Sequence, residues 1–298
     1  MIANSLADFG GNWRKLANMG IKKVKPTTPG RRQASFDDFS DITKKRPEKN
    51  LIKIKKRRGG RSKQGKITVR HRGGGEKRYL RIIDFKRDKY DIPARVASIE
   101  YDPNRGARIA LLYYADGEKK YMIAPIGLKV GEQVISSKKQ VEIKKGNAMP
   151  IKYIPAGVAV YNIELEPGRG AKIARGAGNS VQVMGVEGKY AQIKMPSSEI
   201  RLVKKESLCT VGQASNPDKR HIKFGKAGRK RHLGIKPTVR GKAMNPVDHP
   251  HGGGEGQQPI GLTGPKTKWG KPAFGVKTRK KTKKSNKLII QRRKKKRR

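Results

Sequence analysis

The C-terminal quarter of the chain limits most strongly what the protein can fold into. Residues 221–298 carry 25 lysines and arginines and only two acidic residues, Asp248 and Glu255. So many like charges repel one another in a compact state. Nucleic acid would relieve this repulsion, because each phosphate contact also releases condensed counterions. We therefore expect residues 221–298 to form a basic Gly- and Pro-rich arm that becomes ordered against a polyanion.

The excess of positive charge continues along the whole chain. The formal net charge is +50 over 298 residues, from 73 basic and 23 acidic residues. A single basic run is usually a solvated face or a disordered tail. Here the runs recur at 44–46, 53–63, 70–87, 138–145, 219–231 and 277–298. Together they indicate contact with an extended polyanion on several sides.

An anionic membrane is the competing polyanion. Proteins that bind membrane surfaces usually present an amphipathic basic helix. In this chain glycine and proline interrupt the basic runs, and no apolar run approaches the roughly 18 residues of a spanning helix. We expect no membrane attachment.

The only cysteine, Cys209, excludes a disulfide framework and a thiolate zinc cluster. It fits a small residue in a strand and a reducing, cytosol-like compartment. Residues 1–18 lack the apolar core of a secretory signal and are a poor organelle transit peptide, which favours a bacterial over an organellar protein. Met19, followed by a basic stretch, is an alternative start to Met1.

Strand and turn signals divide the chain into four regions. Residues 1–60 are polar, basic and broken by proline, and we expect an extended arm. Short β-branched and aromatic runs between turn residues then indicate two small barrels, at 61–145 and 146–220, with the arm 221–298 after them. About 160 residues can hold two modest barrels but not one large enzyme core. The expected strands are 66–70, 79–85, 94–101, 109–114, 119–123, 158–165, 171–174, 181–184, 190–195 and 199–203.

Two Gly-rich segments suggest close approach to phosphate. The segment 60–66 spells most of a phosphate-binding loop, but Ile67 stands where a magnesium-binding hydroxyl belongs, and we favour Gly-spaced cations over a nucleotide site. In the segment 71–78 three glycines lie between cationic residues. Without Cβ atoms this backbone can come near a phosphodiester or a base edge. A flexible turn between strands is the simpler interpretation, and the two are compatible.

The segment Asn245–Gly256 raises the question of an enzyme. Its imidazoles and carboxylates, at Asp248, His249, His251 and Glu255, could hold a metal or act as general acid and base. No further His or Cys ligand lies nearby, and no Gly-x-Ser-x-Gly occurs in the chain. We favour a rigid loop packed into folded nucleic acid, with no metal, cofactor or catalytic residue. Because aromatic residues are only 6% of the chain, we expect recognition of structured RNA by shape, phosphate and 2′-hydroxyl contacts rather than by stacking.

Five strings carry a resemblance to a known family. They are Val24–Arg32, Gly65–His71, Arg81–Arg87, Glu100–Arg105 and Thr238–Gly256. From about Met19 to the C-terminus the chain resembles the bacterial-type second protein of the large ribosomal subunit. The resemblance implies a mainly β fold, with an oligonucleotide-binding-type (OB) barrel, a small SH3-like barrel and extended basic arms at both ends.

The resemblance also implies a function and particular residues. It implies a structural constituent of the large subunit that binds ribosomal RNA directly and supports subunit association, transfer-RNA binding and the peptidyl-transferase region. Arg105 and Arg175 match arginines that bind RNA in the family, and His249 matches a histidine that supports the RNA active site. Two positions depart from the family: Glu76 replaces the usual histidine after the triple glycine, and His232 replaces the usual tryptophan.

These inferences give one set of partners and contacts. The expected partners are large-subunit ribosomal RNA, other ribosomal proteins, the small subunit and nearby transfer RNA, in cytoplasmic ribosomes. The alternative function is a chromatin-like protein that compacts nucleic acid. The residues expected to contact RNA are Arg70, His71, Arg72, Lys77, Arg78, Lys86, Arg87, Arg105, Arg175, Lys226, Arg229, Arg240, His249 and His251.

Overall fold

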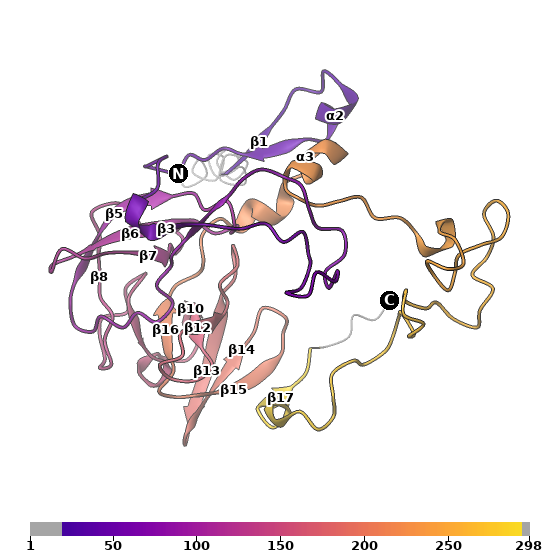
Figure 1. The fold of residues 1–298 in the computed structure, drawn as a ribbon. Coiled ribbons are helices and arrows are strands. Elements are labelled where there is room, and N and C mark those ends of the chain that lie inside the picture. Colours follow the sequence, from indigo (N-terminus) through magenta and orange to yellow (C-terminus); the bar gives the residue numbers. More distant parts are fainter. Residues whose placement is uncertain (1–19, 294–298) are drawn as a thin grey trace, which may run out of the picture. The chain divides into compact units, whose positions relative to one another are not determined.

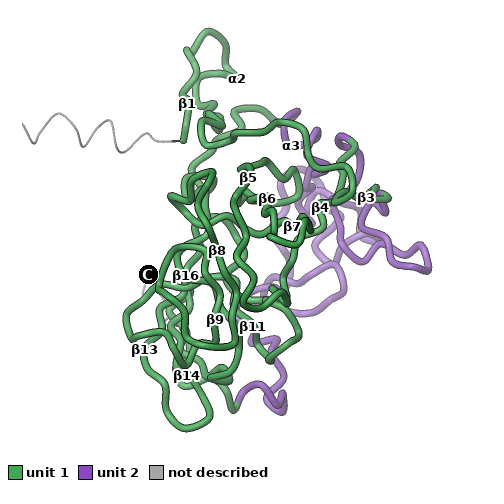
Figure 2. The backbone as a smooth tube through the Cα atoms, turned by 90° about the vertical axis from the view of Figure 1, so that its left-hand side faces the viewer, with its two compact units in different colours: residues 1–56, 77–226, 287–298 green, residues 57–76, 227–286 purple. Residues whose placement is uncertain are grey.

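The computed structural model describes residues 20–293, and the expectations for residues 1–18 and for the start at Met19 lie outside this range. The described residues form two compact units (Figure 2). Unit 1 comprises residues 20–56, 77–226 and 287–293, and unit 2 comprises residues 57–76 and 227–286. Both expected barrels lie mainly in unit 1. No helix within the described range is both long enough and apolar enough to span a bilayer.

The first sheet of unit 1 has four antiparallel strands in the order β7-β6-β5-β8 (Figure 1). Its strands are β5 (Ala94–Glu100), β6 (Ile109–Tyr114), β7 (Lys119–Ile123) and β8 (Gln133–Val134). A tight turn joins β6 to β7, in which Gly117 has φ +82° and donates its N–H to the Tyr114 carbonyl at 3.0 Å. The Asp116-Gly117 pair supplies the positive φ that this tight hairpin turn requires.

Strand β6 shows why the apolar run 109–114 is continuous rather than alternating. Successive side chains of a strand point to opposite faces. Ala110 and Leu112 pack into one apolar cluster, and Ile109 and Leu111 pack into another. The second cluster includes Tyr161 from the following sheet, whose hydroxyl donates to the Ile123 carbonyl at 2.8 Å. Both faces of β6 are therefore buried, which holds the two sheets together in unit 1.

The second sheet has seven strands in the order β17-β15-β14-β13-β10-β16-β9. Its core gathers mainly Ile and Val side chains that alternate along these strands, such as Val181 and Val183 on β13 and Ala191 and Ile193 on β14. Cys209 is buried on β16, where burial and the neighbouring Glu164 raise the pKa of its thiol. The prediction of a small strand residue there is confirmed. The strands are β9 (Ala148–Pro150), β10 (Ala159–Tyr161), β13 (Val181–Glu187), β14 (Tyr190–Lys194), β15 (Ile200–Lys204), β16 (Leu208–Val211) and β17 (Ile289–Gln291).

Smaller elements complete unit 1. Three two-stranded pairings, β1 with β2, β3 with β4 and β11 with β12, flank the two sheets. Helical turns are few and short. These elements are β1 (Ile21–Lys23), α2 (Pro29–Arg32), β2 (Ser35–Asp37), η1 (Lys49–Leu51), β3 (Ile52–Ile54), β4 (Tyr79–Arg81), η2 (Ile151–Tyr153), β11 (Ile163–Glu164), β12 (Ala171–Ile173) and η3 (Pro217–His221).

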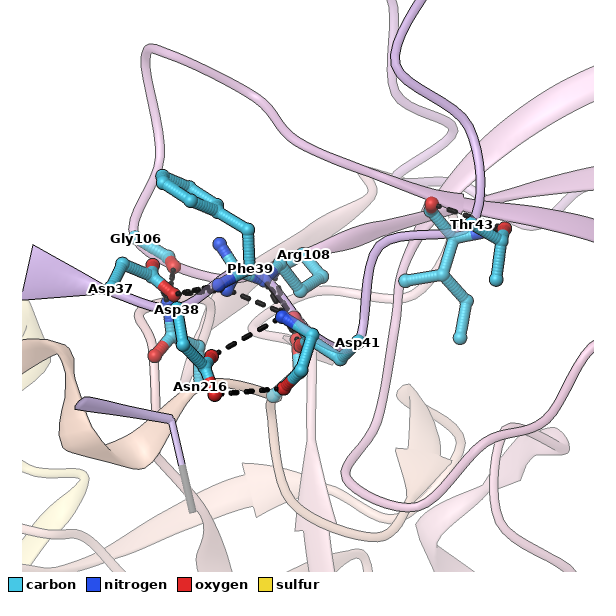
Figure 3. A network of polar contacts seen from close by, with 11 residues as sticks. Asp37, Asp38, Phe39, Asp41, Thr43, Gly106, Arg108 and Asn216 are labelled. Carbon is cyan, nitrogen blue, oxygen red and sulfur yellow. Dashed lines mark hydrogen bonds and ion pairs between the residues drawn. The ribbon is translucent and has the colours of Figure 1, made fainter. Parts of the chain in front are cut away.

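A buried ion-pair network ties the N-terminal segment to the first sheet (Figure 3). The Arg108 guanidinium lies 2.6 Å from Asp37 and donates to Asp41 at 3.0 Å. Asn216 donates to both Asp37, at 3.3 Å, and the Gly106 carbonyl, at 3.0 Å. Thr43 accepts the Ile99 amide at 2.9 Å on the edge of β5. Residues 35–51 therefore lie against the first sheet rather than extending from it as an arm.

Unit 2 contains little regular structure. Its elements are the helix α3 (Ala227–His232) and two short 3₁₀ turns, η4 (Gly241–Ala243) and η5 (Lys284–Asn286). Backbone pairing holds the segment 71–76 against 232–236, through Gly73 to Gly234 at 3.1 Å and Glu76 to His232 at 3.0 Å. A Cβ on Gly75 would lie 2.6 Å from the Gly234 amide nitrogen, so this backbone approach requires glycine.

Most expected strands overlap strands of the structure, but several differ. Strands β1, β2, β3 and β8 were not predicted, and the strand expected at 158–165 is two strands, β10 and β11, that belong to different sheets. The strand expected at 66–70 is wrong, because residues 60–69 form tight turns in which Thr68 and Val69 donate to the Gly60 carbonyl at 3.0 Å. The strand expected at 79–85 is regular only as far as Arg81. Strands β9, β16 and β17 in the second sheet were not predicted. The predicted boundary at 145/146 falls between β8 and β9, which belong to different sheets.

Candidate nucleic-acid interface

Two arginines share one aromatic ring on the surface of unit 1. The guanidinium carbon of Arg105 lies 5.1 Å from the centre of the Phe85 ring, and that of Arg175 lies 4.6 Å from the same centre. Arg105 comes from the loop between β5 and β6, and Arg175 follows β12. The Ala171 amide donates to the Phe85 carbonyl at 2.8 Å, which ties the Phe85 backbone to β12. The ring attracts both cations, although they repel each other.

The two arginines differ in their other partners. The Nε of Arg105 lies 3.1 Å from the carboxylate of Asp102, whose side chain is fully buried. Burial and the charge of Arg105 lower the pKa of Arg175, whose guanidinium nevertheless stays protonated at all physiological pH values. The Nε of Arg105 is buried against Asp102, so the terminal NH groups of its guanidinium are the ones that can reach a phosphate. The pair therefore presents two guanidinium groups close together. A guanidinium can bind a phosphate through two parallel N–H donors.

Four further predicted contacts belong to unit 1 and lie at or near its surface. The Lys77 ammonium lies 5.5 Å from the centre of the Tyr79 ring, and Arg78 donates to the Pro103 carbonyl at 3.3 Å. Lys86 is exposed next to Phe85. Lys226 is exposed and packs its alkyl chain against Gly30. All four are compatible with a solvent-facing cation.

Arg87 is the exception among the predicted contacts. Its side chain is only 3% exposed, and its guanidinium donates to the Gly146 carbonyl at 3.2 Å and contacts the Met122 sulfur at 2.9 Å. The expectation that Arg87 contacts RNA is therefore wrong. Arg87 instead stabilises the inside of the first sheet, and its φ of +53° turns the chain inward.

The other seven predicted contacts belong to unit 2. His71 has φ +59° and accepts the Lys236 amide at 3.0 Å through its carbonyl, and Arg72 forms a bridge with Ile235. The triple glycine thus pairs with this chain's own backbone. Arg72 and Arg240 are exposed, and Arg70 and Arg229 are partly exposed.

The two departures from the family motif face each other. Glu76 Oε1 lies 3.7 Å from His232 Nδ1 in unit 2, and both side chains are largely exposed. The structure brings His232 to Glu76 across the paired segments. An exposed pair of this kind contributes about 0–1 kcal/mol, so it offsets the unfavourable carboxylate without fixing the loop.

Backbone hydrogen bonds define the conformation of the His249 loop, residues 244–253. The Gly253 amide closes it by donating to the Met244 carbonyl at 3.0 Å, and the His249 amide donates to the Asn245 carbonyl at 3.2 Å. The His249 ring lies flat against Gly241, where a Cβ would come within 2.5 Å of the ring. A larger residue at 241 would displace the imidazole.

The imidazole nitrogens of this loop have defined hydrogen-bond roles. The His251 amide donates to His249 Nδ1 at 3.0 Å, and the Lys266 amide donates to His251 Nε2 at 2.8 Å. Partial burial, together with the charges of His251, Arg70 and Lys268, lowers the pKa of His249 and favours the neutral ring at pH 7. With Nδ1 accepting, the proton of neutral His249 sits on Nε2.

These roles also bear on the metal and enzyme alternatives. A backbone amide already donates to His249 Nδ1, and another donates to His251 Nε2. Within residues 20–293 no group of three or more His, Cys, Asp or Glu side chains is placed to hold a metal ion.

Comparison with known families decides what this surface belongs to. Residues 48–136 match the family model for ribosomal proteins L2, RNA-binding N-terminal domain. Residues 144–270 match the model for ribosomal proteins L2, C-terminal domain. The chain belongs to the ribosomal protein L2 family. It is therefore a structural ribosomal protein of the large subunit that binds ribosomal RNA, and its curled sheets are the OB-like and SH3-like barrels of that family.

The structure adds functional candidates that the sequence did not single out. Phe85 joins Arg105 and Arg175, and an aromatic residue beside Lys86 was the available signal. Trp269 and Phe274 are 68% and 80% exposed in unit 2. Recognition by shape rather than by stacking stays a prediction, but these two exposed rings lie outside the expected strands.

Proposed function

We propose that this L2-family protein supports the peptidyl-transferase region, transfer-RNA binding and subunit association, and that it has no catalytic chemistry of its own. The His249 loop carries this proposal. It offers a fixed, neutral N–H donor on a Gly- and Pro-rich backbone that can pack closely against RNA. Such a donor can orient an RNA phosphate or 2′-hydroxyl, which is a positioning role.

The proposed partners follow from the same features. Unit 1 presents the arginine pair and its surrounding lysines, while unit 2 presents the loop in a segment whose acids are confined to Glu76, Asp248 and Glu255. A protein that contacts RNA through two separate units can brace neighbouring RNA segments. We propose that the partners of the protein in the ribosome are ribosomal RNA, other ribosomal proteins, the small subunit and transfer RNA.

Replacing His249 by alanine tests the positioning role. We expect near-normal folding and incorporation into large subunits, because His249 belongs to unit 2 and is in none of the hydrophobic clusters of the barrels. Peptide-bond formation by the substituted subunits should fall about five- to tenfold, the value of one lost hydrogen bond of roughly 1–1.5 kcal/mol. The measurement is single-turnover peptide-bond formation on reconstituted subunits.

The matched control for His249→Ala is Val247→Ala in the same loop. Val247 is 98% exposed, so its truncation should leave both assembly and activity unchanged. Full activity of the His249→Ala subunits would refute the positioning role, and so would equal losses from both substitutions.

A further inference from the structure

Residues 265–273 form a short hairpin in unit 2. The Thr267 amide donates to the Lys271 carbonyl at 2.7 Å, and the Ala273 amide donates to the Pro265 carbonyl at 2.8 Å. Gly270 has φ +74° and donates to the Thr267 carbonyl at 2.9 Å, which makes the tight turn. Trp269 lies at the tip of this hairpin.

Trp269 is exposed without a protein partner. Its side chain is 68% exposed, and within residues 20–293 neither a hydrogen bond nor a ring contact engages it. Indole is the largest apolar side chain, and leaving it in water at the end of a turn forgoes its whole burial energy. A fixed, exposed indole of this kind is a surface for a flat partner.

The charges around the hairpin identify the partner's chemistry. Lys266, Lys268 and Lys271 belong to the hairpin itself, and no acidic residue follows Glu255 in the chain. A partner must therefore be flat, able to stack and anionic beside the stacking group. An unpaired nucleotide meets all three conditions, since its base has a π-face and its phosphates flank it.

The His249 loop holds the base of the hairpin. His251 Nε2 accepts the Lys266 amide at 2.8 Å, and the His251 amide in turn donates to His249 Nδ1 at 3.0 Å. The two imidazole rings lie 4.8 Å apart, centre to centre. The hairpin is thus tied to the loop rather than hanging free, which lowers the entropy lost when Trp269 binds.

We propose that Trp269 is a stacking platform for an unpaired base of large-subunit ribosomal RNA, with Lys268 and Lys271 neutralising the phosphates beside it. This proposal rests on RNA binding by the chain but adds a contact to a base, which the arginine pair and the His249 loop do not provide. The alternative occupant, an apolar patch of a neighbouring protein, is an outcome of the test below.

The test uses the full-length chain with Trp13→Phe, so that Trp269 is the only tryptophan. Full-length large-subunit ribosomal RNA should quench its fluorescence on binding. Trp269→Leu, in the natural background, should weaken RNA binding between about fivefold and about 150-fold, the range for one base stacked on an aromatic side chain. Trp269→Phe should restore most of the affinity, because it restores a ring.

Salt dependence separates stacking from charge. Trp269→Leu should leave the slope of log affinity against log salt unchanged, since no phosphate contact is lost. The matched control Lys268→Gln should reduce that slope by about 0.7–0.9 and keep the fluorescence quench.

Three results would overturn the proposal. They are unchanged affinity of Trp269→Leu, absence of quenching when the RNA is bound, and quenching that appears only when other ribosomal proteins are added. In each of them the chain itself still binds RNA, so the proposed function stands. Failure of the unsubstituted chain to bind the RNA would contradict both the stacking proposal and the proposed function.

Discussion

Replacing Arg108 by alanine is expected to lower the free energy of unfolding by about 3–5 kcal/mol. Arg108 is 2% exposed, and its guanidinium pairs with Asp37, which is 8% exposed. The substitution leaves the Asp37 carboxylate buried without its cation (Figure 3). It also frees Asp41 and with it the anchor of residues 35–51 on the first sheet. Chemical denaturation of the purified chain measures the loss.

A control and a double substitution make this prediction specific. Arg95→Ala removes an exposed arginine from β5 and should change the free energy of unfolding by no more than about 0.5 kcal/mol. Asp37→Leu combined with Arg108→Met should recover most of the loss, because no unpaired charge stays buried. A loss below about 1 kcal/mol for Arg108→Ala would mean that the network does not stabilise the barrel.

Replacing Arg175 by alanine should lower the affinity for large-subunit ribosomal RNA by about 10- to 150-fold, equivalent to roughly 1.5–3 kcal/mol for a charge-assisted contact. Thermal unfolding should not change, because the Arg175 side chain pairs with no buried carboxylate in the described residues. Arg105→Ala should weaken RNA binding similarly, but it should also lower the unfolding temperature. The reason is that the buried carboxylate of Asp102 loses its cation.

Arg169→Ala is the matched control for these two arginines. Arg169 follows β11, is 70% exposed and pairs with the exposed Glu166 at 2.8 Å. Its removal should change RNA affinity by much less than tenfold. If Arg169→Ala and Arg175→Ala weakened binding equally, the arginine pair at Phe85 would be ordinary surface charge.

The fold could be predicted where the residues of a strand and its turns are themselves sufficient to define that strand. Strands β6 and β7 were predicted to the residue, because an apolar run and an Asp-Gly turn define both ends locally. Strand β17 was missed because Leu288 and Ile289 lie among lysines, and only pairing with β15 makes that segment a strand. The expected strand 66–70 alternates like a strand, but among residues 20–293 it makes only an isolated bridge, between Ile67 and Arg61. Local pattern cannot supply a long-range partner.

The candidate nucleic-acid interface, too, could be predicted only in part from the sequence. The positions of basic residues and glycines in the sequence predicted which segments contact RNA. Which of their cations are exposed to solvent depends on the tertiary structure. Arg87 stands in the same basic motif as Lys86, yet its positive φ sends it into the barrel. The pairing of Glu76 with His232 joins positions far apart in the sequence. The exposure of Trp269 likewise depends on the hairpin 265–273, which no alternation of apolar residues in the sequence predicts.

The central claim is that the positive charge of this chain binds folded ribosomal RNA specifically, and not nucleic acid in general. Competition between large-subunit ribosomal RNA and duplex DNA for the full-length chain, at salt between about 0.05 and 0.2 M, tests it most directly. The account predicts that the ribosomal RNA wins by orders of magnitude at every salt concentration. It also predicts that binding to this RNA weakens with salt by about 0.7–0.9 in log–log slope for each phosphate neutralised. Equal affinity for the two polymers, as a chromatin-like compacting protein would show, would contradict it.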